Sequence, residues 1–255
     1  MHEWGEASAP TVACVHGMSA HGARFANLAR YGLADHFHLV APDLRGHGHS
    51  TWDPPWSIEQ HLGDLLASVP ADTRLWVGHS FGGRLVIELA HRFPDRIQRA
   101  VLLDPALWVP PPIALERADG LPNERAYESV TAALAAREDL ATFDPDAHAA
   151  ATVDLEEHLF VGDDGLYRYR YCRNAAITAF SELAASPPST RLTVPVLIVR
   201  ADRSEVCPPE LVDAYHAVAG DMLSSVSVKS GHTVMWEAPV ATNEAISSFF
   251  RSAGT

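Results

Sequence analysis

Ser80 lies between two glycines in the pentad Gly78-His79-Ser80-Phe81-Gly82. A serine hydroxyl becomes a useful nucleophile when a neighbouring base takes its proton, and small flanking residues permit a sharp turn that exposes it. A chain with this much glycine and serine also produces the pattern by chance, and a serine here can simply cap a helix. The pentad is therefore a hypothesis of nucleophilic chemistry that depends on the elements around it.

The segments on both sides of Ser80 favour the nucleophile interpretation. Residues 75–77 are apolar and lead directly into Gly78, which predicts a buried strand. Residues 84–93 carry apolar side chains at helical spacing and stop at Pro94, which predicts a helix. Ser80 is thus predicted to lie at a strand–turn–helix junction, where the helix N-terminus favours developing negative charge.

Apolar runs alternate with helical patterns along most of the chain, and this alternation predicts an α/β fold with a mostly parallel, doubly wound sheet. Strands are predicted over residues 11–15, 38–41, 75–77, 100–103, 194–199 and 223–228. Helices are predicted over residues 22–34, 57–68, 84–93, from Pro208-Pro209 onward, and over 239–251. Ser57 followed by Gln60 is a capping-box pattern and marks the start of the second of these helices.

The alternation of strands and helices stops after the strand that ends near Leu103. From there only helical patterns occur, near residues 123–138, 146–159 and 174–185. We expect residues 105–191 to form a helical cap, inserted into a core made of residues 1–104 and 192–255.

The composition indicates a globular domain and disfavours two classes of partner. The chain has 255 residues, of which 47% are hydrophobic and 20% charged, and its formal net charge of −13 disfavours nucleic acid and anionic membranes as partners. Cys14, Cys172 and Cys207 are too scattered for a disulfide framework, and no signal peptide or membrane-spanning run is visible. We therefore expect a cytoplasmic protein, and the oligomeric state stays open.

Five segments together resemble the α/β-hydrolase family, and the likeness extends over nearly the whole chain. They are His16-Gly17-Met18, residues 43–50, the Ser80 pentad, residues 194–199 and residues 230–239. The resemblance implies an α/β-hydrolase fold with a helical cap, serine hydrolase activity and no cofactor. The leading strands of the family's sheet are short or missing here, because only about ten residues precede the first clear strand.

The resemblance also implies roles for individual residues. Ser80 would be the nucleophile, and His232, just after the last predicted strand, would be the base. The oxyanion hole would consist of the backbone N–H groups of Phe81 and Met18, because backbone donors need no reorganisation when charge appears. His79 is expected to be structural, since the neighbour of the nucleophile points elsewhere from the turn.

The acid that orients His232 has three candidates. By resemblance it follows a strand located between Ser80 and His232. Family members place it three positions after a small residue at the strand end, or four positions when a serine precedes it. Counted from Ala201, this spacing selects Glu205, which follows a serine. The alternatives are Asp202 and, after an earlier strand, Asp104.

The substrate is expected to be a small to medium, largely apolar ester or lactone. Trp108 and Val234 are apolar residues near the predicted pocket and are expected to contact it, because pockets for uncharged ligands are mostly apolar. The pair His47 and His49 lacks the further ligands of a zinc site, so no metal is expected.

Other functions on the same scaffold stay open. The same three residues would serve carbon–carbon bond hydrolysis of a diketone, thioester hydrolysis or perhydrolysis, because function depends on the pocket. A ligand-binding protein without catalysis is the remaining alternative. Epoxide hydrolase and haloalkane dehalogenase chemistry is disfavoured, since relatives with those activities carry Asp at the position of Ser80.

Overall fold

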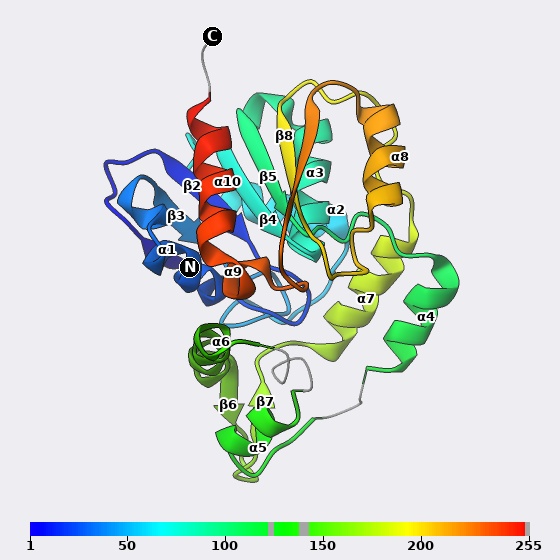
Figure 1. Cartoon of the computed structure of the whole chain (residues 1–255). Helices are drawn as coiled ribbons and strands as arrows, with labels where there is room; N and C mark the ends of the chain where they lie inside the picture. Colours follow the sequence, from blue (N-terminus) through cyan, green and yellow to red (C-terminus); the bar gives the residue numbers. More distant parts are fainter. Residues whose placement is uncertain (122–124, 138–142, 253–255) are drawn as a thin grey trace.

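The computed structural model describes residues 1–121, 125–137 and 143–252 (Figure 1). Within these residues, seven strands form a sheet in the order β1-β3-β2-β4-β5-β8-β9. They are β1 (His2–Trp4), β2 (Thr11–Val15), β3 (His38–Ala41), β4 (Leu75–His79), β5 (Arg99–Leu103), β8 (Val196–Ala201) and β9 (Leu223–Val228). Only β1 is antiparallel to its neighbour. The predicted mostly parallel α/β sheet is confirmed.

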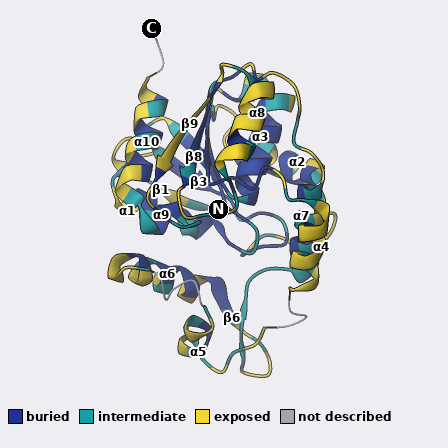
Figure 2. Ribbon diagram, turned by 45° about the vertical axis from the view of Figure 1, so that its right-hand side comes forward, coloured by how far each residue is buried: buried dark blue, intermediate teal, exposed yellow. Residues whose placement is uncertain are grey.

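Helices cover both faces of the sheet (Figure 1). They are α1 (Ala26–Arg30), α2 (Ile58–Ser68), α3 (Phe81–Arg92), α8 (Pro209–Ala219), α9 (Val234–Glu237) and α10 (Pro239–Arg251). Along β2, Val12 and Cys14 face the apolar cluster that α10 also lines. Ala13 and Val15, which alternate with these two residues, face a second apolar cluster, to which α2, α3 and α8 contribute side chains. This alternation gives apolar contacts on both faces of the sheet, and Figure 2 shows the central strands buried between helices with exposed outer faces.

Near the N-terminus one expectation agrees with the structure and another does not. The leading edge of the sheet is short, as expected, because only the three-residue β1 pairs with β3 there. The helix predicted over residues 22–34 is broken into a 3-10 turn (Gly22–Phe25), α1, and a second 3-10 turn (Leu33–Asp35). Gly32, with a φ of +102°, ends the helical run before its predicted limit.

The segment between β5 and β8 forms the lower part of the molecule in Figure 1. It contains α4 (Pro111–Asp119), α5 (Val130–Ala135), α6 (Pro145–His158), β6 (Leu159–Val161), β7 (Tyr167–Tyr169) and α7 (Arg173–Ala184). The expectation of purely helical structure here is wrong, since β6 and β7 form an antiparallel hairpin. The helix predicted over 123–138 is found in part as α5, and its ends reach residues that lie outside the described ranges.

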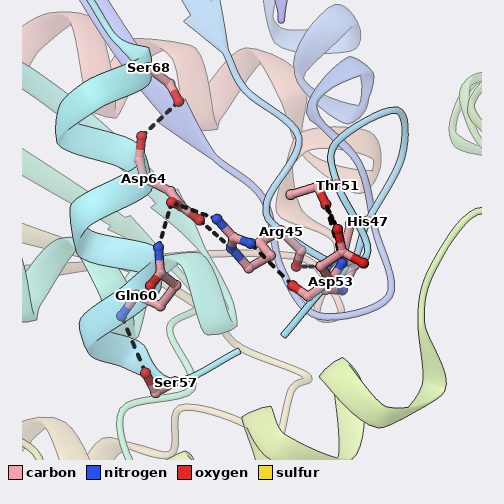
Figure 3. Close-up of polar contacts among 8 residues, drawn as sticks. All are labelled: Arg45, His47, Thr51, Asp53, Ser57, Gln60, Asp64 and Ser68. Carbon is pink, nitrogen blue, oxygen red and sulfur yellow. Dashed lines mark hydrogen bonds and ion pairs between the residues drawn. The ribbon is translucent and has the colours of Figure 1, made fainter. Parts of the chain in front are cut away.

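A polar network fixes the loop after β3 onto α2 (Figure 3). Arg45 donates to both oxygens of Asp64, over 2.7 and 3.1 Å, and to the carbonyl of Asp53. Ser57 accepts the N–H of Gln60 and so caps α2 as predicted. The bidentate pair holds the loop at a defined position, and this loop carries His47 toward the site described next.

No helix in the described part of the chain is long and apolar enough to cross a membrane. Cys14, Cys172 and Cys207 are all free thiols. Burial raises the pKa of Cys207 to about 12, so this thiol stays protonated at neutral pH.

Candidate active site

Ser80 lies in the tight turn between β4 and α3, as predicted. Its φ of +54° and ψ of −118° are strained for a residue with a side chain, at a cost of about 1–3 kcal/mol. A side chain at Gly82 would collide with the backbone of Val15 and His16, and one at Gly78 would collide with Gly82. The pentad's glycines are therefore required by the close packing of the turn. Ser80 occupies the N-cap position of α3, but its side chain makes no capping hydrogen bond to the helix.

His232 is paired with Asp104. Its Nδ1 lies 2.6 Å from Oδ2 of Asp104, whose side chain is fully buried, while the imidazole is 35% exposed. The other Asp104 oxygen accepts the N–H of Ala201 over 3.1 Å. Asp104 follows β5, and its own N–H donates to Val199 on the adjacent strand β8. The carboxylate is thereby fixed where it orients the imidazole and fixes its tautomer.

The assignment of this acid to Glu205 is corrected by that geometry. Glu205 is exposed at the surface, in the loop after β8, where Ser204 accepts the N–H of Val206. Asp202 is also exposed, and its Oδ1 accepts the N–H of Ser230, so it supports the loop that carries His232 rather than the imidazole. The spacing rule counts residues along the chain, so it carries no information about which strand ends nearer to the His232 imidazole in space.

Backbone N–H groups of Met18 and Phe81 lie in the two loops that flank Ser80. Phe81 is the first residue of α3, and in the described chain neither N–H has a hydrogen-bond partner. A Cβ at Gly17 would lie 2.9 Å from the Ser80 Cβ, so the Met18 loop packs directly against the serine. Two unpartnered donors beside a serine hydroxyl are the arrangement that an oxyanion hole requires.

Three buried histidines hold the Met18 loop, and the sequence analysis did not single out one of them, His158. His16 Nε2 accepts the N–H of Leu44, and its Nδ1–H donates to the Gly17 carbonyl over 2.7 Å. His47 Nε2 accepts the N–H of Ser19, and His158 Nε2–H donates to the Ser19 carbonyl. Burial lowers the pKa of His47 to about 4 and those of the other two well below the usual range. All three are neutral at pH 7, as these bonds require.

His79 has a structural contact with the loop of His232. Its Nε2–H donates to the His232 carbonyl over 3.0 Å, and the two rings are 4.7 Å apart. Burial lowers the pKa of His79 well below its usual value, so it adds no charge beside His232. On the other side of the loop, Glu237 accepts the N–H of Gly231. These contacts hold the His232 imidazole beside Ser80.

Ser80 and His232 line one cavity of about 620 Å³, here called the Ser80 cavity. Its described wall includes Met18, three arginines (Arg24, Arg137 and Arg203) and Phe143. No direct hydrogen bond joins the Ser80 and His232 side chains within the described residues, and such bonds often tighten only when substrate binds.

The two substrate-binding residues expected from the sequence lie elsewhere. Val234 is fully buried in the apolar core, and Trp108 is at the surface, where its indole N–H donates to Ala184. Neither belongs to the described wall of the Ser80 cavity. The described wall does include the apolar side chains of Met18 and Phe143, but it also holds three arginines that the sequence analysis did not place there.

One group of side chains in the described chain has metal-ligand spacing, namely His2, His21 and Asp43. Asp43 already accepts the N–H groups of Gly22 and His49, and His21 Nε2 donates to a buried aspartate. The group does not line the Ser80 cavity. His47 uses both ring nitrogens for hydrogen bonds, so it does not pair with His49 as a ligand.

Known proteins resemble the chain in both sequence and fold. The model of the alpha/beta hydrolase fold family matches residues 10–139. Lipase LipV from Mycobacterium tuberculosis is 30% identical over 254 residues, which cover 97% of this chain and 96% of the lipase. A bifunctional esterase/perhydrolase from Acinetobacter calcoaceticus is 28% identical over 225 residues, or 82% and 79% of the two chains.

A solved structure shows the same architecture. The crystal structure of E-2-(acetamidomethylene)succinate hydrolase superposes with a TM-score of 0.83, at 26% identity, over 98% of this chain and 94% of that one. Taken with the family match and the lipase, this likeness identifies the chain as a member of the α/β-hydrolase fold family and as a hydrolytic enzyme.

Proposed function

We infer that the protein hydrolyses small carboxylic esters through an acyl-enzyme formed on Ser80. The observation that carries this proposal is the 2.6 Å pair of buried Asp104 with His232, whose imidazole lines the same cavity as Ser80. A serine at a strained strand–helix turn, an imidazole with a fixed tautomer and a buried carboxylate are the three parts of a serine hydrolase site.

The reaction follows from these positions. Ser80 Oγ attacks the ester carbonyl while His232 takes its proton through Nε2, and Asp104 stabilises the imidazolium that forms. The Phe81 and Met18 N–H groups donate to the carbonyl oxygen as it becomes negative. His232 then protonates the leaving alcohol, and the acyl group stays on Ser80 until water, deprotonated by His232, releases the acid.

Residues 105–191 act in this proposal as a cap over a core of residues 1–104 and 192–255. Arg137 and Phe143 come from the segment between β5 and β8 and line the Ser80 cavity beside core residues. The names of similar proteins, a lipase and an esterase, support ester hydrolysis. One similar protein is also named a perhydrolase, so substrate tests should include peracid formation and thioesters next to esters and lactones.

Covalent labelling tests the proposal directly. A fluorophosphonate should label the wild-type protein at Ser80, and Ser80→Ala should abolish labelling and lower ester turnover by about 10⁴-fold or more. Ser181→Ala, which changes an exposed serine on α7, is the control and should retain both. Labelling at another residue, or a tenth of the activity left in Ser80→Ala, would contradict the serine mechanism.

A further inference from the structure

A second cavity adjoins the Ser80 cavity on the side of the β6–β7 hairpin. It measures about 180 Å³, and its described wall includes Arg24, Arg125, Arg137, His158, Tyr169 and Tyr171. Arg24 and Arg137 line both cavities, so the two spaces share a wall. We call the second cavity the arginine branch. Its described wall holds three arginines and no Asp or Glu, although the chain carries a formal net charge of −13.

Arg24 is held rigidly at the junction of the two cavities. Its Nε and Nη2 donate to the two oxygens of Asp154, over 3.4 and 3.0 Å, and its guanidinium carbon lies 4.8 Å from the Trp236 ring centre. Its side chain is only 12% exposed. The remaining nitrogen, Nη1, has no hydrogen bond within the described residues. A guanidinium fixed in this way is preorganised to donate to a further anion.

The other two arginines are close to the phenols of the hairpin. Burial raises the pKa of Tyr169, and the charges of Arg137 and Arg125 oppose that rise. Burial likewise raises the pKa of Tyr171, again opposed by Arg125. Both phenols therefore stay protonated at neutral pH and can donate hydrogen bonds. Guanidinium and phenol donors thus converge on one small space.

We propose that the arginine branch binds a carboxylate of the substrate, so that the enzyme prefers esters whose far end is anionic. Planar guanidinium forks match the two oxygens of a carboxylate, which explains why arginines would line such a space. Half-esters of aliphatic dicarboxylic acids have the required chemistry, with the ester carbonyl at Ser80 and the free carboxylate in the branch. This inference rests on the ester hydrolysis proposed above.

The arrangement also supplies selectivity against neutral esters. An apolar chain end in the branch would displace water from guanidinium and phenol groups without replacing those hydrogen bonds, which is unfavourable. A carboxylate replaces them with charge-assisted bonds. Arg203 is not part of this group, because it lines the Ser80 cavity but not the arginine branch.

Matched substrates test the preference. The monoethyl esters of succinate, glutarate and adipate are compared with ethyl butanoate, pentanoate and hexanoate, which have the same carbon number but a methyl end. Ethanol release gives kcat/KM for each. The wild-type enzyme should prefer the anionic member of at least one pair by about tenfold or more, as expected for charge-assisted hydrogen bonds. Free adipate should inhibit competitively, and inorganic phosphate should inhibit less.

Variants of the branch locate the effect. Arg125→Gln and Arg137→Gln should each lower the anionic-to-neutral ratio of kcat/KM by about tenfold, and Arg125→Lys should keep part of it. Arg117→Gln removes the same charge from the exposed surface of α4, outside both cavities, and should leave the ratio unchanged. Arg24 is unsuitable, since its loss would leave Asp154 buried without its partner. Thermal unfolding checks that each variant is folded.

The outcomes separate this proposal from the one on which it rests. If a fluorophosphonate labels Ser80 but no pair favours the anionic ester, or Arg117→Gln lowers the ratio as much as the branch variants, the carboxylate site is refuted and the esterase proposal stands. Stronger inhibition by phosphate than by adipate would also refute a carboxylate site. If Ser80 is not labelled and no ester is turned over, the esterase proposal itself fails.

Discussion

His232 and Asp104 come from segments that follow β9 and β5, and their side chains meet at 2.6 Å. The strand β5 is the immediate neighbour of β4, and Leu103 lies opposite His79 in their register. Asp104 and Ser80 thus directly follow the paired last residues of two adjacent strands. The acid reaches the imidazole from this position without a long loop, and the Ala201 N–H fixes its second oxygen.

Asp104→Asn should therefore lower ester turnover far more than changes at the other two candidates. An amide at this position favours the wrong imidazole tautomer and no longer stabilises the imidazolium, which corresponds to a loss of about 10⁴-fold in kcat. Steady-state kinetics on a short-chain ester, with circular dichroism to check folding, measures the effect.

The matched controls are Glu205→Gln and Asp202→Asn. Both residues are exposed, and neither contacts the His232 imidazole in the described structure. Glu205→Gln should stay within about twofold of wild type, as is usual for surface substitutions. A crippled Glu205→Gln variant, with Asp104→Asn active, would restore the assignment made from spacing.

The sheet and its helices were predictable because their signals are local. Alternate apolar residues in β2 face the two apolar clusters, and the Ser57 cap marks the start of α2 where the sequence indicated it. The β6–β7 hairpin was missed because its strands are short and lie among helices. Strands of this kind are stabilised by their pairing and by contacts that no short stretch of sequence displays.

Only the site residues that lie in recognisable sequence motifs were predictable. Ser80 and His232 were placed by their flanking residues, and both line the same cavity. The acid and the arginine wall depend on which strand ends and loops meet in space, and that is a tertiary property. The sequence did show Asp104 directly after a predicted apolar strand, but that this strand lies next to β4 is known only from the structure, and the spacing rule favoured Glu205.

Gly17→Ala should damage catalysis without a large loss of stability. The added methyl group would lie 2.9 Å from the Ser80 Cβ and would displace the loop that presents the Met18 N–H. Loss of one oxyanion donor typically costs about 10²–10³-fold in kcat. Gly63→Ala is the control, because a Cβ there meets nothing within 4 Å and should stabilise α2 by about 0.5–1 kcal/mol. Equal kinetics in the two variants would contradict the role of the loop.

The folded state should become less stable as the pH falls from 6.5 toward 4. Burial lowers the pKa of His47 from 6.5 to about 4, so the unfolded chain binds a proton in this window that the folded chain does not. The free energy of unfolding therefore falls with decreasing pH, by about 3 kcal/mol for this residue over the whole window. Other buried histidines, such as His16, add to the effect.

Urea unfolding across this pH window measures the slope. His47→Gln keeps an acceptor for the Ser19 N–H but does not titrate. The slope of its unfolding free energy against pH should therefore correspond to about one proton fewer than the wild-type slope. His36→Gln, at an exposed histidine, should keep the wild-type slope. An unchanged slope in His47→Gln would show that His47 is not held neutral in the fold.

Asp154→Asn tests how α6 is attached to the core. The buried Asp154 accepts hydrogen bonds from His21 and Arg24, both in the loop and turn after β2. Burial alone would raise the pKa of Asp154, but these two partners hold it well below its usual range. An amide would leave the Arg24 charge without its partner in a place that is only 12% exposed.

Removal of one member of such a buried pair costs about 3–5 kcal/mol, so Asp154→Asn should lower the melting temperature markedly. Glu156→Gln removes one negative charge from the exposed face of the same helix and should change stability by less than about 0.5 kcal/mol. Because Arg24 also lines the Ser80 cavity, Asp154→Asn should change kinetics on anionic esters more than on neutral ones. Equal melting temperatures for the two variants would show that the pair does not hold α6 to the core.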